Sequence, residues 1–230
     1  MEIGIIGTGN IGSTLAGYLT KLSHQVAIAN SRGPDTLIEI ATKTGANPVS
    51  VEAAASAKDL VVISIPQNAL AKLPRDILSI SKAIILDTGN YYPSRDGKIT
   101  EIENGLTDSE WTTKVIGHSV IKAFNHIGAQ SLAEKALSAG NSNRIALSVA
   151  GNDDEQKEVV MKLIDEIGFD AIDGGSLSES WRQQAGEASY AQDVDKETLK
   201  AALQKADISK RAENLATADE MARPYFLKNN

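Results

Sequence analysis

The chain has 230 residues, no cysteine, and 30 acidic against 23 basic side chains, which gives a formal net charge of -7. The length is sufficient for a sizeable buried core, and the lack of cysteine excludes disulfide scaffolds, thiolate nucleophiles and cysteine-ligated zinc. The acidic balance argues against nucleic acid as a partner. No apolar run reaches the roughly 20 residues of a membrane span, and the first residues do not have a basic region followed by an apolar stretch, so we expect a cytoplasmic protein that does not enter a membrane.

Short apolar runs rich in Ile and Val alternate with segments of helical length. Runs of this kind are typical of strands buried on both faces of a sheet, and they lie at 2–6, 25–29, 60–65, 83–87, 119–124 and 145–150. Helices are predicted over 10–22, 34–44 and 153–167. Thr107 and Glu110 have the spacing of a capping box ahead of a further short helix. This alternation predicts an α/β protein with a Rossmann-type, doubly wound and mostly parallel sheet.

The last third of the chain has a different pattern. Gly168, Gly174 and Gly175 interrupt it, so we expect one domain over 1–175 and a small helical segment over 176–230. Residues 193–222 are helical in pattern but too polar to form a core alone, which favours a homodimer that uses this segment.

A glycine motif directly follows the first predicted strand and opens the first predicted helix. It reads Gly7-Thr8-Gly9-Asn10-Ile11-Gly12, which is the pattern G-x-G-x-x-G. The first glycine permits a tight turn, the second lets a pyrophosphate approach the backbone, and the third allows close packing of helix on strand. The free N–H groups of the helix N-terminus favour phosphate. The sequence therefore predicts that the domain over 1–175 binds a dinucleotide.

The second predicted strand ends in Asn30-Ser31-Arg32. An NAD site usually places an acidic residue here to bind the ribose 2′-hydroxyl, whereas an arginine accommodates a 2′-phosphate. The absence of an acid together with the presence of Arg32 indicates NADP as the cofactor. In the alternative interpretation, Arg32 is only a solvated loop residue.

Further candidates lie at the ends of three other predicted strands, at the edge of the sheet where ligands bind in this fold. They are Ile65-Pro66-Gln67, Asn90, and Asn125-His126. Pro66 can leave backbone exposed beside a nicotinamide, and Asn90 and Asn125 offer amide donors and acceptors, although Pro and Asn are also common turn formers. We expect Asn125 and His126 to be catalytic, with His126 as a proton donor near neutral pH, or else as a half-exposed loop histidine. No histidine or carboxylate cluster has the spacing of a metal site.

Taken together, these segments resemble the NADP-dependent oxidoreductase family that includes the deazaflavin-dependent NADP reductases and the cytosolic domain of six-transmembrane metalloreductases. The resemblance is carried by IGIIGTGNIGSTLA, NSR, VVISIP, LDTGN, VIKAFNHIGA and GFDAIDGGSLSESWR. It implies that Thr8, Asn10 and Ile11 contact the cofactor phosphates, that Ser31 and Arg32 contact the 2′-phosphate, and that Ile65 and Pro66 lie beside the nicotinamide. It also implies that Asn125 lines the hydride-transfer crevice and that C-terminal segments of a dimer complete the acceptor pocket.

The chain departs from the family pattern at His126, where the family has a small hydroxyl residue, and after Trp181, where a Pro-rich stretch is missing. Three hypotheses for the function therefore stand. The first is hydride transfer between NADP(H) and a flavin- or deazaflavin-like acceptor, in which stacking geometry does most of the work. The second is reduction of a small imine or carbonyl compound, which needs a proton donor such as His126. The third is a non-enzymatic module that senses NADP(H).

Overall fold

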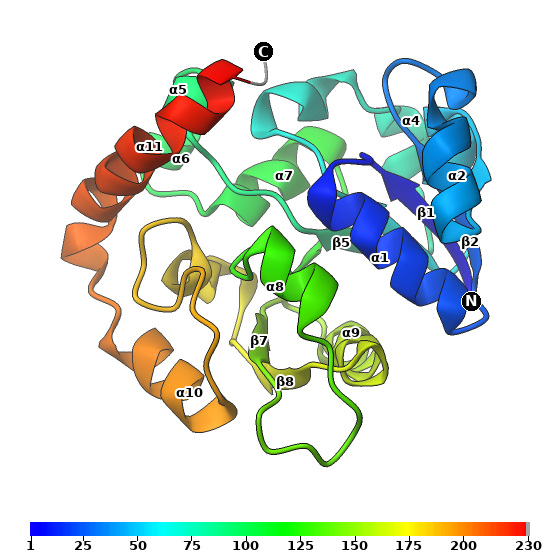
Figure 1. The fold of residues 1–230 in the computed structure, drawn as a ribbon. Helices are drawn as coiled ribbons and strands as arrows, with labels where there is room; N and C mark the ends of the chain where they lie inside the picture. Colours follow the sequence, from blue (N-terminus) through cyan, green and yellow to red (C-terminus); the bar gives the residue numbers. More distant parts are fainter. Residues whose placement is uncertain (229–230) are drawn as a thin grey trace.

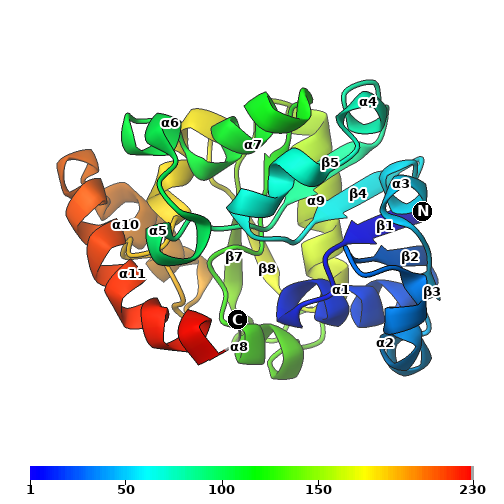
Figure 2. The same ribbon diagram turned by 90° about the horizontal axis from the view of Figure 1, so that it is seen from above.

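The structure is a computed structural model that describes residues 1–228. A parallel sheet with helices on both faces runs through the molecule (Figures 1 and 2). In spatial order, its six strands are β3 (Asn47–Pro48), β2 (Gln25–Ala29), β1 (Glu2–Ile6), β4 (Leu60–Ile63), β5 (Ile84–Asp87) and β6 (Ile121–Lys122). Every pair of neighbours in this sheet is parallel. The expected Rossmann-type sheet is confirmed.

The strand order reverses between β1 and β4. From β1 the chain first builds outward to β2 and β3, then returns to the other side of β1 to build β4, β5 and β6. Ile5 pairs with Ile28 of β2 and with Val62 of β4, so the carboxyl ends of these strands lie at one level. In open sheets of this kind the ligand lies in the crevice outside the strand ends at the reversal.

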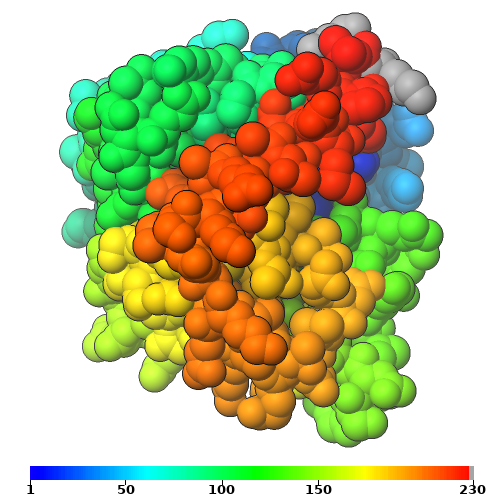
Figure 3. Space-filling model, turned by 90° about the vertical axis from the view of Figure 1, so that its left-hand side faces the viewer, coloured from blue at the N-terminus to red at the C-terminus, as the bar shows by residue number. Residues whose placement is uncertain are grey.

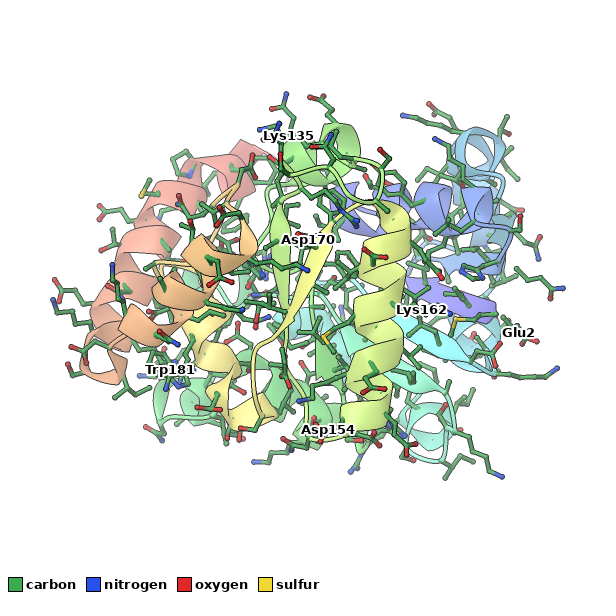
Figure 4. All side chains as sticks on the ribbon, turned by 90° about the horizontal axis from the view of Figure 1, so that it is seen from below. Glu2, Lys135, Asp154, Lys162, Asp170 and Trp181 are labelled. Atoms are coloured by element: carbon green, nitrogen blue, oxygen red, sulfur yellow. The ribbon has the colours of Figure 1, made fainter. Side chains whose placement is uncertain are left out.

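Two further strands continue the structure beyond β6. β7 (Ala146–Val149) and β8 (Asp170–Asp173) pair in parallel with each other. The backbones of Lys122 and Ala150 exchange two hydrogen bonds, of 2.8 and 3.0 Å, in an antiparallel bridge. β7 therefore joins the edge of the main sheet in the reverse direction. Figure 4 shows this side of the molecule, with Asp170 on β8 and Asp154 at the start of the helix that follows β7.

The helices have the following bounds. The α-helices are α1 (Asn10–Lys21), α2 (Ile38–Thr44), α3 (Val51–Ala55), α4 (Arg75–Leu78), α5 (Pro93–Asp96), α6 (Thr100–Glu103), α7 (Asp108–Ile116), α8 (Ala129–Glu134), α9 (Asp154–Ile167), α10 (Lys196–Lys205) and α11 (Arg211–Lys228). The 3-10 helices are η1 (Pro34–Leu37), η2 (Gln67–Lys72), η3 (Leu177–Gln183) and η4 (Ile208–Lys210).

Alternate residues of the strands pack into two separate clusters, one on each face of the sheet. On one face Ile5 and Val62 pack with Leu15 of α1 and Val160 of α9. On the other face, Ile6, Val61 and Ile63 pack with Ala54 of α3, Leu78 of α4 and Ile116 of α7. Because successive side chains of a strand point to opposite faces, a continuous apolar run serves both clusters at once.

The C-terminal segment packs on the α/β part. Leu199 and Leu203 of α10 lie against Ala146 of β7 and Ile172 of β8, and α11 runs alongside α5 in both ribbon views (Figures 1 and 2). The division of the chain at residue 175 stays a prediction.

Most of the expected elements appear. The helices over 10–22, 34–44 and 153–167 are confirmed as α1, as η1 with α2, and as α9. The capping box is also present, since the Thr107 hydroxyl accepts from the Glu110 N–H and the Glu110 carboxylate accepts from the Thr107 N–H. The sequence pattern missed β3 because it has two residues and contains Pro48, and it missed β8 because polar residues flank its short apolar centre.

Candidate active site

A cleft of about 380 Å³ lies at the carboxyl edge of the sheet, where the strand order reverses. Its walls come from the turns after β1, β4, β5 and β6, and from the end of α11. They include Gly9, Asn10, Ile11, Ile65, Pro66, Asn90, Tyr92, Arg95, Asn125, Tyr190, Tyr225 and Phe226. In Figure 3, blue atoms of the N-terminal part are visible in a recess beside the red end of α11. Residues from both ends of the chain thus form one cavity.

The glycine turn has the geometry that its three glycines predict. Gly7 has a φ of 105°, and a Cβ there would lie 2.2 Å from the Ser64 carbonyl oxygen. A Cβ on Gly12 would lie 2.0 Å from the Gly7 oxygen, which explains the need for close packing of α1 on β1. A Cβ on Gly9 would meet no atom within 4 Å. The space over Gly9 is therefore left open on the cleft side.

The N-terminus of α1 faces this open space without a side-chain cap. Gly9 is the N-cap residue and the first turn contains no acidic side chain. The first N–H groups of a helix lack partners within the helix, and its N-terminus carries a partial positive charge. This combination provides donors for a phosphate group.

The end of β2 lies outside the cleft proper. The Asn30 side chain is used locally, since its Oδ1 accepts from the Arg32 N–H at 2.9 Å and its Nδ2 donates to the Thr36 hydroxyl at 3.0 Å. The Ser31 and Arg32 side chains are exposed. This arrangement leaves Ser31 and Arg32 accessible beside the glycine turn and assigns Asn30 to shaping the loop.

The segment after β4 divides into cleft and core. Ile65 and Pro66 line the cleft. Gln67 does not: its side chain is buried, and its Oε1 accepts a long hydrogen bond of 3.4 Å from the Thr112 hydroxyl of α7. The expectation that Gln67 contacts the cofactor does not agree with this position.

Asn90 and Asn125 form a reciprocal pair at the floor of the cleft. The Asn90 Nδ2 donates to the Asn125 backbone oxygen at 2.7 Å, and the Asn125 Nδ2 donates to the Asn90 Oδ1 at 3.0 Å. Gln183 of η3 completes the pair, because it donates to the Asn125 Oδ1 at 2.9 Å and its backbone oxygen accepts from the Asn125 Nδ2. The amides that the sequence places at two strand ends are thus held together and fixed from the C-terminal side.

A buried ion pair lies beneath these amides. The Lys122 Nζ is 3.4 Å from the Asp87 Oδ2, and neither side chain is accessible to solvent beyond 2%. The same ammonium donates to the Gly89 carbonyl oxygen, and the Gly89 N–H donates to the Asp87 Oδ1 at 2.8 Å. The hydroxyl groups of Ser109 and Thr112 also donate to Asp87. These bonds fix the turn that carries Asn90.

His126 does not face the ligand as we expected. Its ring is 1% exposed and is absent from the cleft wall, and its Nε2 accepts from the Ser148 N–H at 2.8 Å. Burial lowers the pKa of this imidazole to about 4. A neutral ring whose Nε2 lone pair is already used cannot act as a general acid at neutral pH, so we correct the proton-donor assignment.

The aromatic side of the cleft was not predicted from single residues. Tyr92 and Arg95 come from the long loop after β5, Tyr190 from the loop after η3, and Tyr225 and Phe226 from α11. The only signals in the sequence were the length of the 88–107 loop and the expectation that C-terminal segments complete the pocket.

The end of α11 is held over the cleft by polar and aromatic contacts. The Asp219 carboxylate accepts from the Ser94 N–H and hydroxyl, at 2.9 and 2.7 Å. The rings of Tyr92 and Phe226 meet edge to face, with centroids 5.1 Å apart, and the Arg95 guanidinium lies 5.3 Å from each centroid. Such contacts fix the aromatic wall in this structure.

Comparison with known proteins identifies the family. The sequence model of a family described as NADP oxidoreductase, coenzyme F420-dependent, matches residues 2–91. The structure of a hypothetical protein, SMa0349 from Sinorhizobium meliloti, is similar with a TM-score of 0.71 and 30% identity, covering 85% of this chain and 96% of that protein. The chain belongs to the F420-dependent NADP oxidoreductase family.

Two further proteins extend the comparison. A candidate F420-dependent NADP reductase from Arthrobacter sp. FB24 has a TM-score of 0.64 at 24% identity, covering 78% of this chain and 87% of that protein, which shows a shared fold. The Escherichia coli (strain K12) protein YjhV is 40% identical over 63 residues, which are 27% of this chain. The match spans only 46% of that relative's length.

The description of this family names NADP as the coenzyme of its oxidoreductases. The structure fits that cofactor, since the open space over Gly9 and the uncapped helix N-terminus suit a pyrophosphate. Within residues 1–228, no three His, Asp or Glu side chains are grouped to hold a metal ion. Over the same range, no helix has both the length and the hydrophobicity to cross a membrane.

Replacing Arg32 with alanine is expected to weaken NADPH binding and to spare NADH, because we expect the exposed guanidinium to bind the 2′-phosphate. A charge-assisted hydrogen bond contributes roughly 1.5 to 3 kcal/mol, so the dissociation constant for NADPH should rise about 10- to 150-fold. Calorimetric titration with both cofactors measures the change. Lys58→Ala, an exposed cation at the opposite end of β1, is the matched control. Equal affinity of the unmutated protein for NADH and NADPH would contradict the assignment.

The buried His126 predicts a loss of stability in acid. Its folded-state pKa of about 4 lies below the ordinary value of 6.5, so the unfolded chain binds the proton first. The contribution is complete above pH about 6.5 and is lost as the pH falls towards 4; linkage gives a loss of about 2 kcal/mol between pH 7 and pH 5. Urea unfolding of the wild type and of His126→Gln at both pH values measures it. If the two proteins show the same pH dependence, the assignment is wrong.

Proposed function

We propose that this protein transfers a hydride between NADP(H) and a flavin- or deazaflavin-like ring acceptor. The observation that carries the proposal is the aromatic wall of the cleft, formed by Tyr92, Tyr225 and Phe226 and facing the same cavity as the glycine turn. A planar conjugated ring can stack against or edge onto such side chains, and hydride transfer between two rings depends chiefly on their mutual placement. The family description, which names coenzyme F420, supports the same acceptor class.

Each part of the site then has a task. The helix N-terminus at Asn10 binds the pyrophosphate, and Arg32 with Ser31 binds the 2′-phosphate. Bound NADPH supplies the hydride. Ile65 and Pro66 bound the cleft on the nicotinamide side, and the Asn90–Asn125 pair orients the groups that meet at its floor.

Reduction of a small imine or carbonyl compound is the second candidate. It is favoured by one observation, a pair of tyrosine hydroxyl groups in the cleft, at Tyr92 and Tyr190. These groups replace His126 as the source of the proton that such a reaction needs. A sensing module without turnover has no support from a family of oxidoreductases.

The proposal is tested by following NADPH oxidation with a panel of acceptors: FMN, FAD, a deazaflavin, quinones, ferric chelates, cyclic imines, ketones and aldehydes. We expect the fastest turnover with a flavin or deazaflavin. Gly9→Glu is the variant that should block cofactor binding. Its side chain has room to extend into the cleft without a clash at Cβ, and it places a negative charge where we propose that a phosphate binds. It should abolish NADPH oxidation with the fold intact. Turnover confined to imines or carbonyls would favour the second candidate, and failure with every acceptor would refute both.

A homodimer that uses the C-terminal segment is the further part of the proposal. The apolar residues Met221 and Leu227 on α11 are 79% and 73% exposed. Exposing this apolar surface to water is unfavourable for a monomer, and a second copy packed against α11 would bury it. Light scattering is expected to give the mass of a dimer at tens of micromolar protein. Met221→Lys with Leu227→Lys should shift the mass towards that of the monomer, whereas Lys58→Ala should not. A monomeric wild type at that concentration would refute the prediction.

A further inference from the structure

Two tyrosine hydroxyl groups meet inside the cleft. The Tyr92 and Tyr190 oxygens are 2.7 Å apart, although the residues are 98 positions apart in the chain. Tyr92 follows β5 and Tyr190 follows η3, and both residues line the cavity that the glycine turn and Pro66 also line. The pair is therefore built from two separate loops of the cleft wall.

One of the two hydroxyl protons of this pair has no acceptor within the pair. Each hydroxyl has one proton to donate, and the bond between the two oxygens uses one proton, whichever residue donates it. Among the residues that the structure describes, the remaining proton has no acceptor, since the other bond of the pair is a donation from the Asn90 Nδ2 to the Tyr190 oxygen at 3.5 Å. One hydroxyl proton is thus left for a molecule in the cleft.

The surroundings indicate which oxygen carries that proton. Tyr190 can accept from both Tyr92 and Asn90, so that its own proton is the one left over. Burial raises the pKa of both tyrosines, and the charge of Arg95 lowers both against that effect. The hydrogen bond between them lowers the pKa of Tyr190 and raises that of Tyr92. Both hydroxyls remain protonated at neutral pH, and their mutual bond favours Tyr190 as the proton donor of the two.

We propose that Tyr190 donates its proton to the acceptor and that Tyr92 positions the Tyr190 hydroxyl. This inference rests on the proposed function, and it narrows the acceptor to molecules in which the atom that receives the hydride belongs to a C=O or C=N bond or is conjugated with one. Ring acceptors and small imines or carbonyls share this chemistry. The Tyr92–Tyr190 pair can therefore act on either class of acceptor.

The reaction balances with groups already named. The hydride, with its electron pair, forms a new bond to the acceptor: a C–H bond on a carbonyl, imine or deazaflavin carbon, or an N–H bond on the flavin N5. The displaced π electrons move, directly or through the conjugated ring, to an oxygen or nitrogen atom, and that atom takes the proton of Tyr190. The Tyr190 phenolate, held by Tyr92 and the positive charge of Arg95, regains a proton from water. The acceptor gains two electrons and one proton in addition to the hydrogen of the hydride, and the cofactor leaves oxidised.

Three substitutions separate this role from packing. Tyr190→Phe removes the donor and Tyr92→Phe removes its partner, and each keeps the ring. Tyr18→Phe is the matched control, because its hydroxyl bonds to the Leu132 and Ala133 carbonyls and lies outside the cleft. General acid catalysis contributes about 10²- to 10⁴-fold, so kcat with the acceptor found in the panel should fall by at least about 100-fold in Tyr190→Phe. Tyr92→Phe should show a smaller loss, Tyr18→Phe none, and all three should bind NADPH like the wild type.

Binding gives a readout that does not depend on turnover. With NADP⁺ bound, no hydride is available, so calorimetry with FMN and with 2-pyrrolidinone, an amide that mimics a small carbonyl or imine, measures anchoring alone. Whichever of the two probes accepts a hydrogen bond from Tyr190 should bind Tyr190→Phe with a dissociation constant about 3- to 10-fold higher, because one neutral hydrogen bond is lost. Weaker FMN binding indicates a ring acceptor, and weaker 2-pyrrolidinone binding indicates a small one.

The outcomes distinguish failure of the Tyr190 inference from failure of the proposed function. Turnover of Tyr190→Phe within about threefold of the wild type, with unchanged affinity for both probes, would overturn the inference. A matching loss of NADPH affinity would also overturn it, because the hydroxyl would then serve the cofactor. If the wild type fails to oxidise NADPH with every acceptor in the panel, but a probe binds more weakly to Tyr190→Phe than to the wild type, the proposed function fails and the role of Tyr190 in binding the acceptor is supported.

Discussion

The buried ion pair between Lys122 and Asp87 is the interaction on which the architecture of the cleft depends. It joins the ends of the neighbouring strands β5 and β6, and it also holds the turn that follows β5 through both the N–H and the carbonyl of Gly89. Breaking a buried pair by removing one partner typically costs about 3 to 5 kcal/mol, because the other charge is left without compensation. The Asp87 carboxylate is further satisfied by two hydroxyl groups of α7. Strand ends, turn and helix therefore form one rigid unit beneath the amide pair.

The dinucleotide half of the site was predictable because its determinants are local. Three glycines, the strand before them and the helix after them lie within the first 21 residues, and each glycine has a steric reason that a short pattern records. The strands were predictable because burial on both faces demands continuous apolar runs. Asn90 and Asn125 followed from the rule that ligands bind at strand ends, although their mutual bonds could not be inferred without the sheet order.

The wrong assignment of His126 has a simple geometric cause. Asn125 lines the cleft whereas His126 is buried away from it, because residues 124–127 form a bend and not an extended strand. The preceding residue, Phe124, has a φ of 60°, so the chain turns sharply here and spacing alone does not reveal the direction of any side chain. The acceptor wall was not predictable for another reason. Tyr92 lies 98 positions from Tyr190, and Phe226 is further still from Tyr92 along the chain; such long-range proximity leaves no periodic signal.

The attachment of α11 also bears on how this scaffold can change over time. The helix touches the α/β part chiefly at α5, through Asp219 and Phe226, while the phosphate-binding turn has its own supports in β1, β4 and α1. Substitutions at Ala222, Tyr225 or Phe226 can therefore remodel one wall of the cavity without disturbing the nucleotide end. Drift in the last two turns of α11 can in this way reshape one wall of the cavity while the glycine turn is inherited unchanged.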